Sequence, residues 1–161
     1  MKNLKRVFNK IGKLLVKEFK TELEQQGHRA SKSGSIIDGL RFTTSDTELR
    51  ITTDKAYAAV LNNGSNPHFP NRDAIEDWVR KKGFASDEKE VKKIAYAVAL
   101  RISKEGTPTK ESYSPSITNN GRRTGFIEQV INTNKQQITK DIQSAVGKDI
   151  EILFTKLPKE I

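Results

Sequence analysis

The sequence has 161 residues, of which 34% are hydrophobic and 30% are charged, and this composition is typical of one globular domain rather than of a disordered chain. The absence of cysteine excludes disulfides and thiolate metal sites. No apolar run is long enough to span a bilayer, and the lysines at 10, 13 and 17 interrupt any signal-peptide core, so we expect no membrane association.

The formal net charge of +9 favours a polyanionic partner, and nucleic acid is the usual one. Solvated lysines that only raise solubility would give the same charge. The value alone therefore identifies no groove, base or reaction.

Residues 3–26 are predicted to form a long amphipathic helix, because apolar residues recur at spacings of three and four. The apolar stripe consists of Leu4, Val7, Phe8, Ile11, Leu14, Leu15, Phe19 and Leu23. The other face is basic over residues 2–20, where only Glu18 opposes Lys2, Lys5, Arg6, Lys10, Lys13, Lys17 and Lys20. Such a helix could pack on its own domain with its lysines in water, track phosphates, or lie on an anionic membrane. The lack of Trp and Tyr in the segment argues against the membrane.

Residues 27–35 are predicted to form a loop, and two half-buried strands are expected over 40–44 and 47–53. The alternation of Leu40 and Phe42, and of Leu49 and Ile51, with polar residues favours a hairpin. One hairpin is not stable alone, so it must pack on the first helix or join a larger sheet. Its edge could receive a strand of a neighbouring subunit, which makes these four residues a candidate subunit interface.

The middle of the chain is predicted to hold a pair of helices. Residues 57–61 favour a short helix, after which two prolines at 67 and 70 impose an extended path. Asn71 can then cap a helix that ends at Gly83 and carries Ile75 and Trp78 on one face, so that both can reach the same core.

A second helix of this pair is expected to begin at Ser86 and to end at Gly106. Its buried stripe is predicted to be Val91, Ile94, Ala95, Val98, Ala99 and Ile102. Two helices closed by glycine and joined by a tight connection form a compact αα unit.

Residues 106–123 are a polar stretch that is long for a loop without structure of its own. It could be a projecting arm that becomes ordered against a neighbour, through Tyr113, or a plain flexible insertion. Basic residues that could face DNA lie near its two ends, Lys104 and Lys110 at one and Arg122 and Arg123 at the other.

A last helix is expected to follow, with Thr124 as its cap, Gly147 as a weak point and Pro158 after its end. Its apolar residues are Phe126, Ile127, Val130, Ile131, Ile138, Ile142, Val146, Ile150 and Leu153.

No catalytic or metal-binding constellation is found. His28 and His68 are the only histidines, and neither has a nucleophile or further ligands beside it in the sequence. Asp73 and Asp77 have helical i, i+4 spacing, but Asp73 suits the first turn of its helix and Asp77 can pair with Lys81. We therefore expect no enzyme, no cofactor and no metal, and we interpret His68 as a turn residue that packs on Trp78 or bonds the local backbone.

A series of short motifs runs through the middle third in a fixed order: Tyr57-Ala58, Gly64-Ser65, Pro67-His68, Ile75-x-x-Trp78-Val79, Lys82-Gly83, Ile94-Ala95 and Gly106-Thr107. This order resembles the tail-completion and head–tail connector (neck) proteins of tailed bacteriophages, the small proteins akin to minor tail protein Z of phage lambda. The resemblance covers about a third of the chain. Ser65 stands where threonine is usual in this family, and a long polar insertion follows Pro108.

The resemblance implies a single α+β domain over residues 1–161, with several antiparallel strands flanked by helices. It implies a virion protein, made in the host cytoplasm, whose copies form a ring of six at the neck. The ring would bind portal or head-completion proteins on one side and tail-tube or tail-terminator proteins on the other, and would leave a channel for packaged DNA. The motif residues would be the scaffold that positions the contact surfaces.

Two other readings stay open. A stand-alone basic module that binds DNA or RNA would hold duplex at moderate salt and lose affinity steeply as salt rises. An accessory enzyme would show metal-dependent activity that is lost on mutation of Asp73 or Asp77.

Overall fold

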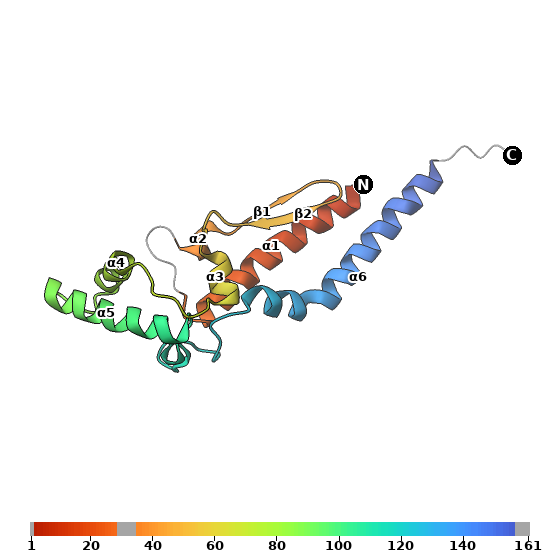
Figure 1. Cartoon of the computed structure of the whole chain (residues 1–161). Coiled ribbons are helices and arrows are strands. Elements are labelled where there is room, and N and C mark those ends of the chain that lie inside the picture. Colours follow the sequence, from red (N-terminus) through yellow and green to blue (C-terminus); the bar gives the residue numbers. More distant parts are fainter. Residues whose placement is uncertain (1, 29–34, 157–161) are drawn as a thin grey trace. The chain divides into compact units, whose positions relative to one another are not determined.

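The computed structural model describes residues 2–28 and 35–156, which form an α+β fold of helices and one hairpin (Figure 1). In chain order the elements are α1 (Lys2–Gln25), α2 (Ile36–Gly39), β1 (Arg41–Thr44), β2 (Leu49–Thr52), α3 (Ala58–Asn63), α4 (Arg72–Lys82), α5 (Glu88–Glu105), the 3₁₀ turn η1 (Lys110–Tyr113) and α6 (Phe126–Thr155). The predicted fold class, with its long first helix, hairpin, central helix pair and last helix, is confirmed.

The chain divides into two compact units. Unit 1 comprises residues 1–58 and 125–161, and unit 2 comprises residues 59–124. Unit 1 is thus assembled from both ends of the sequence. The single domain expected over residues 1–161 stays a prediction.

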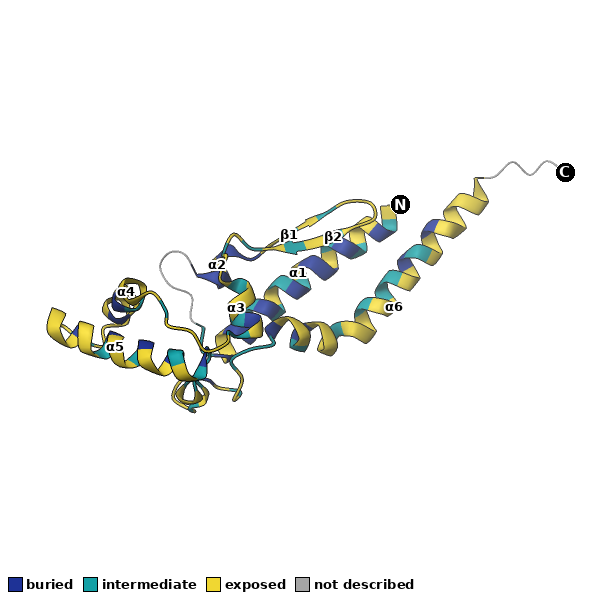
Figure 2. Ribbon diagram, in the orientation of Figure 1, coloured by how far each residue is buried: buried dark blue, intermediate teal, exposed yellow. Residues whose placement is uncertain are grey.

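The first and last helices, α1 and α6, pack antiparallel in unit 1 (Figure 1). Buried positions recur along the length of α1, as the colouring of its ribbon shows (Figure 2). Near one end Phe19 meets Phe126 edge to face, with ring centroids 5.9 Å apart. Near the other end Leu4 and Phe8 pack against Ala145. The helix predicted over residues 3–26 is therefore confirmed. Of the three alternatives considered for its apolar stripe, packing within its own unit is the one observed.

The N-terminus of α1 is closed by a side chain from α6. The carboxylate of Asp149 accepts hydrogen bonds from the backbone N–H of Leu4 at 2.9 Å and of Asn3 at 3.2 Å, and from the Asn3 amide at 3.1 Å. Free N–H groups and a partial positive charge are what the first turn of a helix presents, and α1 has no acidic residue of its own there. Asp149 is therefore a cap supplied from 145 residues away along the chain.

The hairpin of β1 and β2 packs against α1. Arg41 pairs with Thr52 and Thr44 with Leu49, and residues 45–48 form the turn, closed by a 2.8 Å bond from the Ser45 N–H to the Glu48 carbonyl. Leu49 joins the cluster around Leu4 and Phe8. The predicted hairpin and its packing on the first helix are confirmed, whereas only two of the several strands that the family resemblance implies are present in the described residues.

The start of the first strand differs from the prediction. Residues 36–39 form one helical turn, which begins at Ser35, whose hydroxyl accepts from the Asp38 N–H. Leu40 ends this turn and is buried instead of being paired in β1. Part of the predicted loop, residues 29–34, lies outside the described residues.

Helices α4 and α5 form the core of unit 2. The Asn71 side chain accepts from the N–H groups of Asp73 and Ala74, and Gly83 ends α4 in the left-handed conformation, both as predicted. The cap of α5 is Asp87 and not Ser86, because the Asp87 carboxylate accepts from the Glu90 N–H. The helix ends at Gly106 as expected, and its predicted stripe is buried or half-buried.

The prediction that Trp78 faces the core is wrong. Its side chain is 40% exposed, whereas its neighbour Val79 is fully buried against Val91 and Ala95. Successive helix residues point about 100° apart, so a contact centred on Val79 leaves Trp78 at the margin. There its ring packs edge to face on the exposed ring of Phe84, with centroids 5.2 Å apart.

The segment after α5 has structure of its own. It contains η1, an ion pair between Arg101 and Glu111, and the buried Thr118, whose hydroxyl donates to the Arg122 carbonyl at 2.9 Å. The helix α6 then begins after Gly125 and not after the predicted cap Thr124. It runs through Gly147 to Thr155, and the predicted stop at residue 158 lies outside the described residues.

The Asp149 cap predicts an acid-dependent loss of stability. Burial raises the pKa of Asp149, but the hydrogen bonds from the Leu4 and Asn3 amides outweigh it and hold the pKa below its usual value. A depressed pKa stabilises the fold above the pKa of the unfolded chain, and this contribution is lost as the pH falls through the folded value. We expect Asp149→Asn to lower the melting temperature at neutral pH and to reduce its acid dependence, as followed by circular dichroism. Asp46→Asn, which removes an exposed carboxylate 3.6 Å from Lys5, is the control and should change little; equal effects would contradict the cap.

Candidate functional site

The two halves of the motif series meet in unit 2. Ser65 and Thr107, 42 residues apart, form an isolated antiparallel bridge with N–H to carbonyl bonds of 2.7 and 3.2 Å. Their hydroxyl oxygens are also 2.7 Å apart. The segment before α4 is thereby fastened to the end of α5, so the predicted motif residues around Gly64 and Gly106 share one junction.

Glycine is required on both sides of this junction. Gly64 has φ +73°, and a Cβ there would lie 2.6 Å from the Thr107 carbonyl oxygen. Gly106 has φ 79° and ψ −161°, a region that is essentially restricted to glycine, and a Cβ there would overlap the Ser65 carbonyl oxygen. The two glycines therefore allow the close backbone approach on which the Ser65–Thr107 bridge depends.

An open polar depression of about 330 Å³ lies beside the junction. Its lining residues are Asn63, Gly64, Ser65, Asn66, Thr107, Pro108, Tyr113 and Thr124. His68 is exposed near it, with Nδ1 2.9 Å from the Asn66 carbonyl oxygen and 3.4 Å from the Ser65 hydroxyl. Of the two roles predicted for His68, bonding to the local backbone is the one observed.

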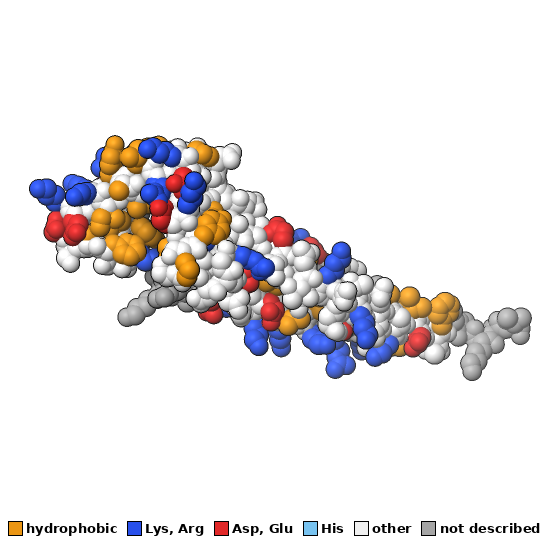
Figure 3. Space-filling model, turned by 90° about the horizontal axis from the view of Figure 1, so that it is seen from below, with side chains coloured by type: hydrophobic (Ala, Val, Ile, Leu, Met, Phe, Trp, Pro, Cys, Tyr) orange, Lys and Arg blue, Asp and Glu red, His pale blue; other side chains and the backbone are white. Residues whose placement is uncertain are grey.

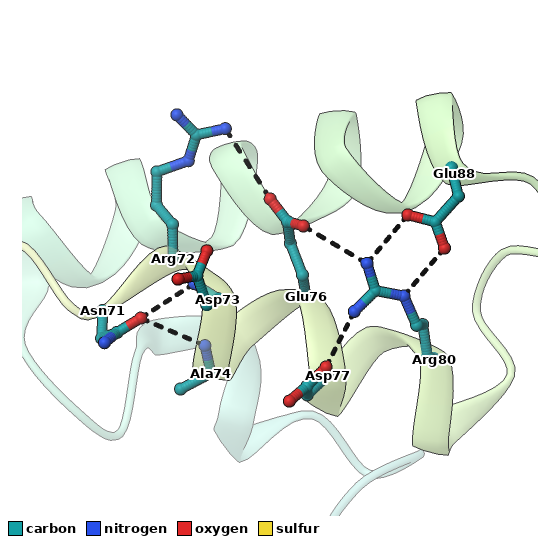
Figure 4. A network of polar contacts seen from close by, with 8 residues as sticks. All are labelled: Asn71, Arg72, Asp73, Ala74, Glu76, Asp77, Arg80 and Glu88. Carbon is teal, nitrogen blue, oxygen red and sulfur yellow. Dashed lines mark hydrogen bonds and ion pairs between the residues drawn. The ribbon is translucent and has the colours of Figure 1, made fainter.

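Of the two acidic residues that could have shared a metal, the Asp77 carboxylate belongs to a structural network, whereas Asp73 takes part only through its backbone N–H, which donates to Asn71 (Figure 4). Arg80 of α4 forms a two-pronged contact with Glu88 of α5, at 2.9 and 2.8 Å, and bonds Asp77 at 2.8 Å. The buried Glu76 lies 3.4 Å from Arg80 and 3.8 Å from Arg72. Asp77 thus pairs with Arg80 and not with the predicted Lys81. Hydrogen bonding to Glu88 raises the pKa of Arg80, and the same contact lowers the pKa of Glu88.

The hairpin residues predicted for a subunit interface are used within unit 1. Leu40 is buried, Leu49 joins the core cluster, and Phe42 and Ile51 are half-buried. The Phe42 ring lies directly over Gly12 of α1, where a Cβ would collide with it. Part of their apolar surface is therefore already used within unit 1, and their role at a subunit interface stays a prediction.

The other predicted interface and DNA-facing residues all lie in unit 2. Tyr113 is 43% exposed at the end of η1, Lys104 lies in the last turn of α5, and the Lys110 N–H donates to the Glu105 carboxylate at 2.8 Å. Arg122 and Arg123 come directly after the bend at residues 119–121. Arg123 is half-buried, and burial lowers its pKa while Tyr113 opposes the change.

The most exposed apolar group on the described residues was not singled out from the sequence. The last turns of α6, beyond Asp149, carry Ile150, Ile152, Leu153 and Phe154, of which Phe154 is 68% and Leu153 62% exposed. We call these four residues the α6 tip. Hydrophobic side chains gather next to the C-terminal end in Figure 3. Three consecutive apolar residues in a helix cannot all face one side, so the run at 152–154 was the available signal.

Comparison with protein-family models, with curated proteins and with solved structures gave no match. None of the helices in the described ranges has the length and hydropathy of a membrane span. Over the same ranges no group of three or more His, Cys, Asp or Glu residues is placed to hold a metal ion.

The junction predicts unequal effects of two glycine substitutions. Gly106→Ala should cost about 1–3 kcal/mol from backbone strain, and more from the overlap with the Ser65 carbonyl. Gly83→Ala is the matched control, because Gly83 also has positive φ but its Cβ would meet nothing within 4 Å, so we expect only about 1–2 kcal/mol. Denaturant unfolding measures both, and hydrogen exchange at the Ser65 and Thr107 amides should quicken only in Gly106→Ala. Equal costs would show that the bridge contributes nothing.

The Arg80 network predicts that charge alone does not suffice at this position. Arg80→Lys keeps the positive charge but cannot reproduce the two-pronged contact with Glu88. We expect lower thermal stability and greater hydrogen exchange at the N-terminus of α5. Lys81→Arg, one residue along the same helix turn, should leave both unchanged. A fully stable Arg80→Lys variant would argue against the role of the paired geometry.

Proposed function

We propose that the protein is a structural subunit of a tailed bacteriophage, at the neck, where it completes the tail by joining the head connector to the tail. In this role it acts by contact between copies in a ring and with the proteins above and below, and packaged DNA passes through the centre. It would be made in the host cytoplasm and built into the virion.

The motif order in residues 57–107 supports this proposal, together with the way those residues are used. Gly64, Gly106 and Thr107 build the junction at the Ser65–Thr107 bridge. Asn71 and Gly83 define the ends of α4. These are structural roles, as expected of a scaffold that carries contact surfaces. A scaffold of this kind suits a protein that works by shape.

The observation that carries the proposal is the α6 tip. Its four apolar residues are 43–68% exposed in the isolated chain and lie on more than one side of the helix. A helix that is apolar all round is normally buried, and an exposed apolar cluster marks a site of protein contact. A ring needs one patch of each subunit to meet a different patch of the next, and we assign the α6 tip as one of the two.

The test replaces the two most exposed residues of the α6 tip. Leu153→Ser with Phe154→Ser should abolish ring formation by the purified chain, measured by sedimentation and negative-stain electron microscopy. Lys148→Ser with Glu151→Ser is the matched control, because it places the same residue in the same helix end without removing apolar surface. The control should form rings as the unchanged chain does.

The proposal fails if the unchanged chain stays monomeric at all concentrations and with the neighbouring neck proteins. It also fails if electron microscopy and mass spectrometry of purified virions find no copy of this chain below the portal.

A further inference from the structure

The outward face of α1 carries a line of basic residues. Lys2, Arg6, Lys13 and Lys17 are exposed and Lys20 is half-buried. At 3.6 residues per turn these five side chains leave the helix within a sector of about 60°, and at a rise of 1.5 Å per residue they extend over about 27 Å. We call these five residues the α1 basic stripe.

The acidic residues beside the stripe are bound to other groups. On the hairpin side Asp46 pairs with Lys5, and on the α6 side Asp141 lies 3.1 Å from Lys10, which holds the pKa of Asp141 below its usual value. Asp149 bonds the first-turn amides of α1. Within the described part of the chain none of the five stripe residues forms an ion pair, and Glu24 marks the end of the line.

The packing of α1 excludes the usual way in which a basic amphipathic helix binds a membrane. That mode requires the apolar face to enter the lipid boundary. Here Leu4, Phe8, Leu15 and Phe19 are no more than 9% exposed, because the hairpin and α6 cover them. Only the charged face of α1 is exposed, so the helix has no apolar surface with which to enter a lipid bilayer.

The stripe is also suited to a duplex more than to a single strand. Proteins that hold single strands interleave basic residues with aromatic rings on which bases stack. Both aromatic residues of α1, Phe8 and Phe19, are buried. A helix that presents a line of cations and no stacking surface matches a backbone that presents closely spaced phosphates along a stiff rod.

We propose that the α1 basic stripe binds the phosphate backbone of double-stranded DNA, without regard to sequence. Contacts to phosphates position a duplex but carry no base information. The inference rests on the proposed function for its biological setting, where it assigns α1 as the surface that meets the packaged DNA. The α1 basic stripe thus takes the place of the residues that the sequence analysis favoured for DNA contact, namely Lys104, Lys110, Arg122 and Arg123.

The experiment measures binding of the full chain to a short labelled duplex by fluorescence anisotropy, at salt concentrations from about 50 to 200 mM. The stripe variant carries Lys2→Gln, Arg6→Gln, Lys13→Gln, Lys17→Gln and Lys20→Gln. The control variant loses as much charge from unit 2, through Lys89→Gln, Lys92→Gln, Lys93→Gln, Lys104→Gln and Lys110→Gln. Both variants fall from a net charge of +9 to +4, since each loses five positive charges.

We expect the unchanged chain and the control to bind with a slope of log K against log salt near −4.5, at roughly −0.9 for each of five neutralised phosphates. The stripe variant should lose at least tenfold in affinity at low salt, and its slope should move toward zero. Circular dichroism checks that both variants fold. Should the stripe variant not fold, acetylation footprinting of the unchanged chain replaces it, and DNA should then protect the four stripe lysines from the reagent.

Equal losses in the two variants would overturn the proposal, as would the absence of duplex binding at low salt. Binding to vesicles of anionic lipid but not to duplex would assign the stripe to a membrane surface instead. Ring formation is measured without DNA, so intact rings with no duplex binding contradict this inference alone. Duplex binding by a chain that never forms rings contradicts the proposed function and favours the stand-alone nucleic-acid module.

Discussion

The carboxylate of Asp149 at the first turn of α1 is the contact that defines unit 1. It satisfies backbone N–H groups that would otherwise face water or a buried surface, and it places a negative charge where the helix dipole favours one. The contact also sets the register between α1 and α6. With Asp149 at Leu4, Asp141 lies at Lys10 and Phe126 at Phe19. The hairpin covers a further part of the apolar face of α1, with Phe42 placed on Gly12, and leaves the charged face exposed.

Because α6 is held at Asp149, its last turns extend past the end of α1, and their apolar side chains are left exposed by the residues that the structure describes (Figure 1). The exposed tip and the basic stripe are therefore two results of the same arrangement. The apolar face of α1 is used for packing, its charged face is left outside, and the end of α6 is left apolar and uncovered. Unit 2 depends on a different device, in which Gly64 and Gly106 let two backbone segments meet at the Ser65–Thr107 bridge.

Much of the fold could be predicted from local signals. Periodicity located α1 and α5, alternation located the hairpin, and the ends of α4 at Asn71 and Gly83 followed from capping chemistry, because each signal lies within a few residues of its effect. Where two adjacent residues could both cap a helix, as at Ser86 and Asp87, the sequence could not choose between them.

The features that escaped prediction depend on distant partners. Nothing near Asp149 in the sequence indicates that it serves a helix at the other end of the chain. The exposure of Trp78 depends on Val91 and Ala95, which centre the contact with α5 on Val79. A large aromatic side chain suggested a buried tryptophan, but Trp78 lies one residue before the contact position Val79 and is therefore exposed. Likewise the packing of Phe42 over Gly12 and of Leu49 beside Leu4 and Phe8 joins elements that are distant in the sequence.

The composition of unit 1 from both ends of the chain has a consequence for its synthesis on the ribosome. The apolar face of α1 between Leu4 and Leu23 is made first, whereas its partners Phe126, Ala145 and Asp149 are added long afterwards. Until then the nascent helix has only α2 and the hairpin to cover it among the described elements, and contacts between residues so far apart in sequence close slowly. Premature termination before residue 126 would therefore leave a chain whose first helix exposes its aromatic side chains, a product prone to aggregate or to be degraded.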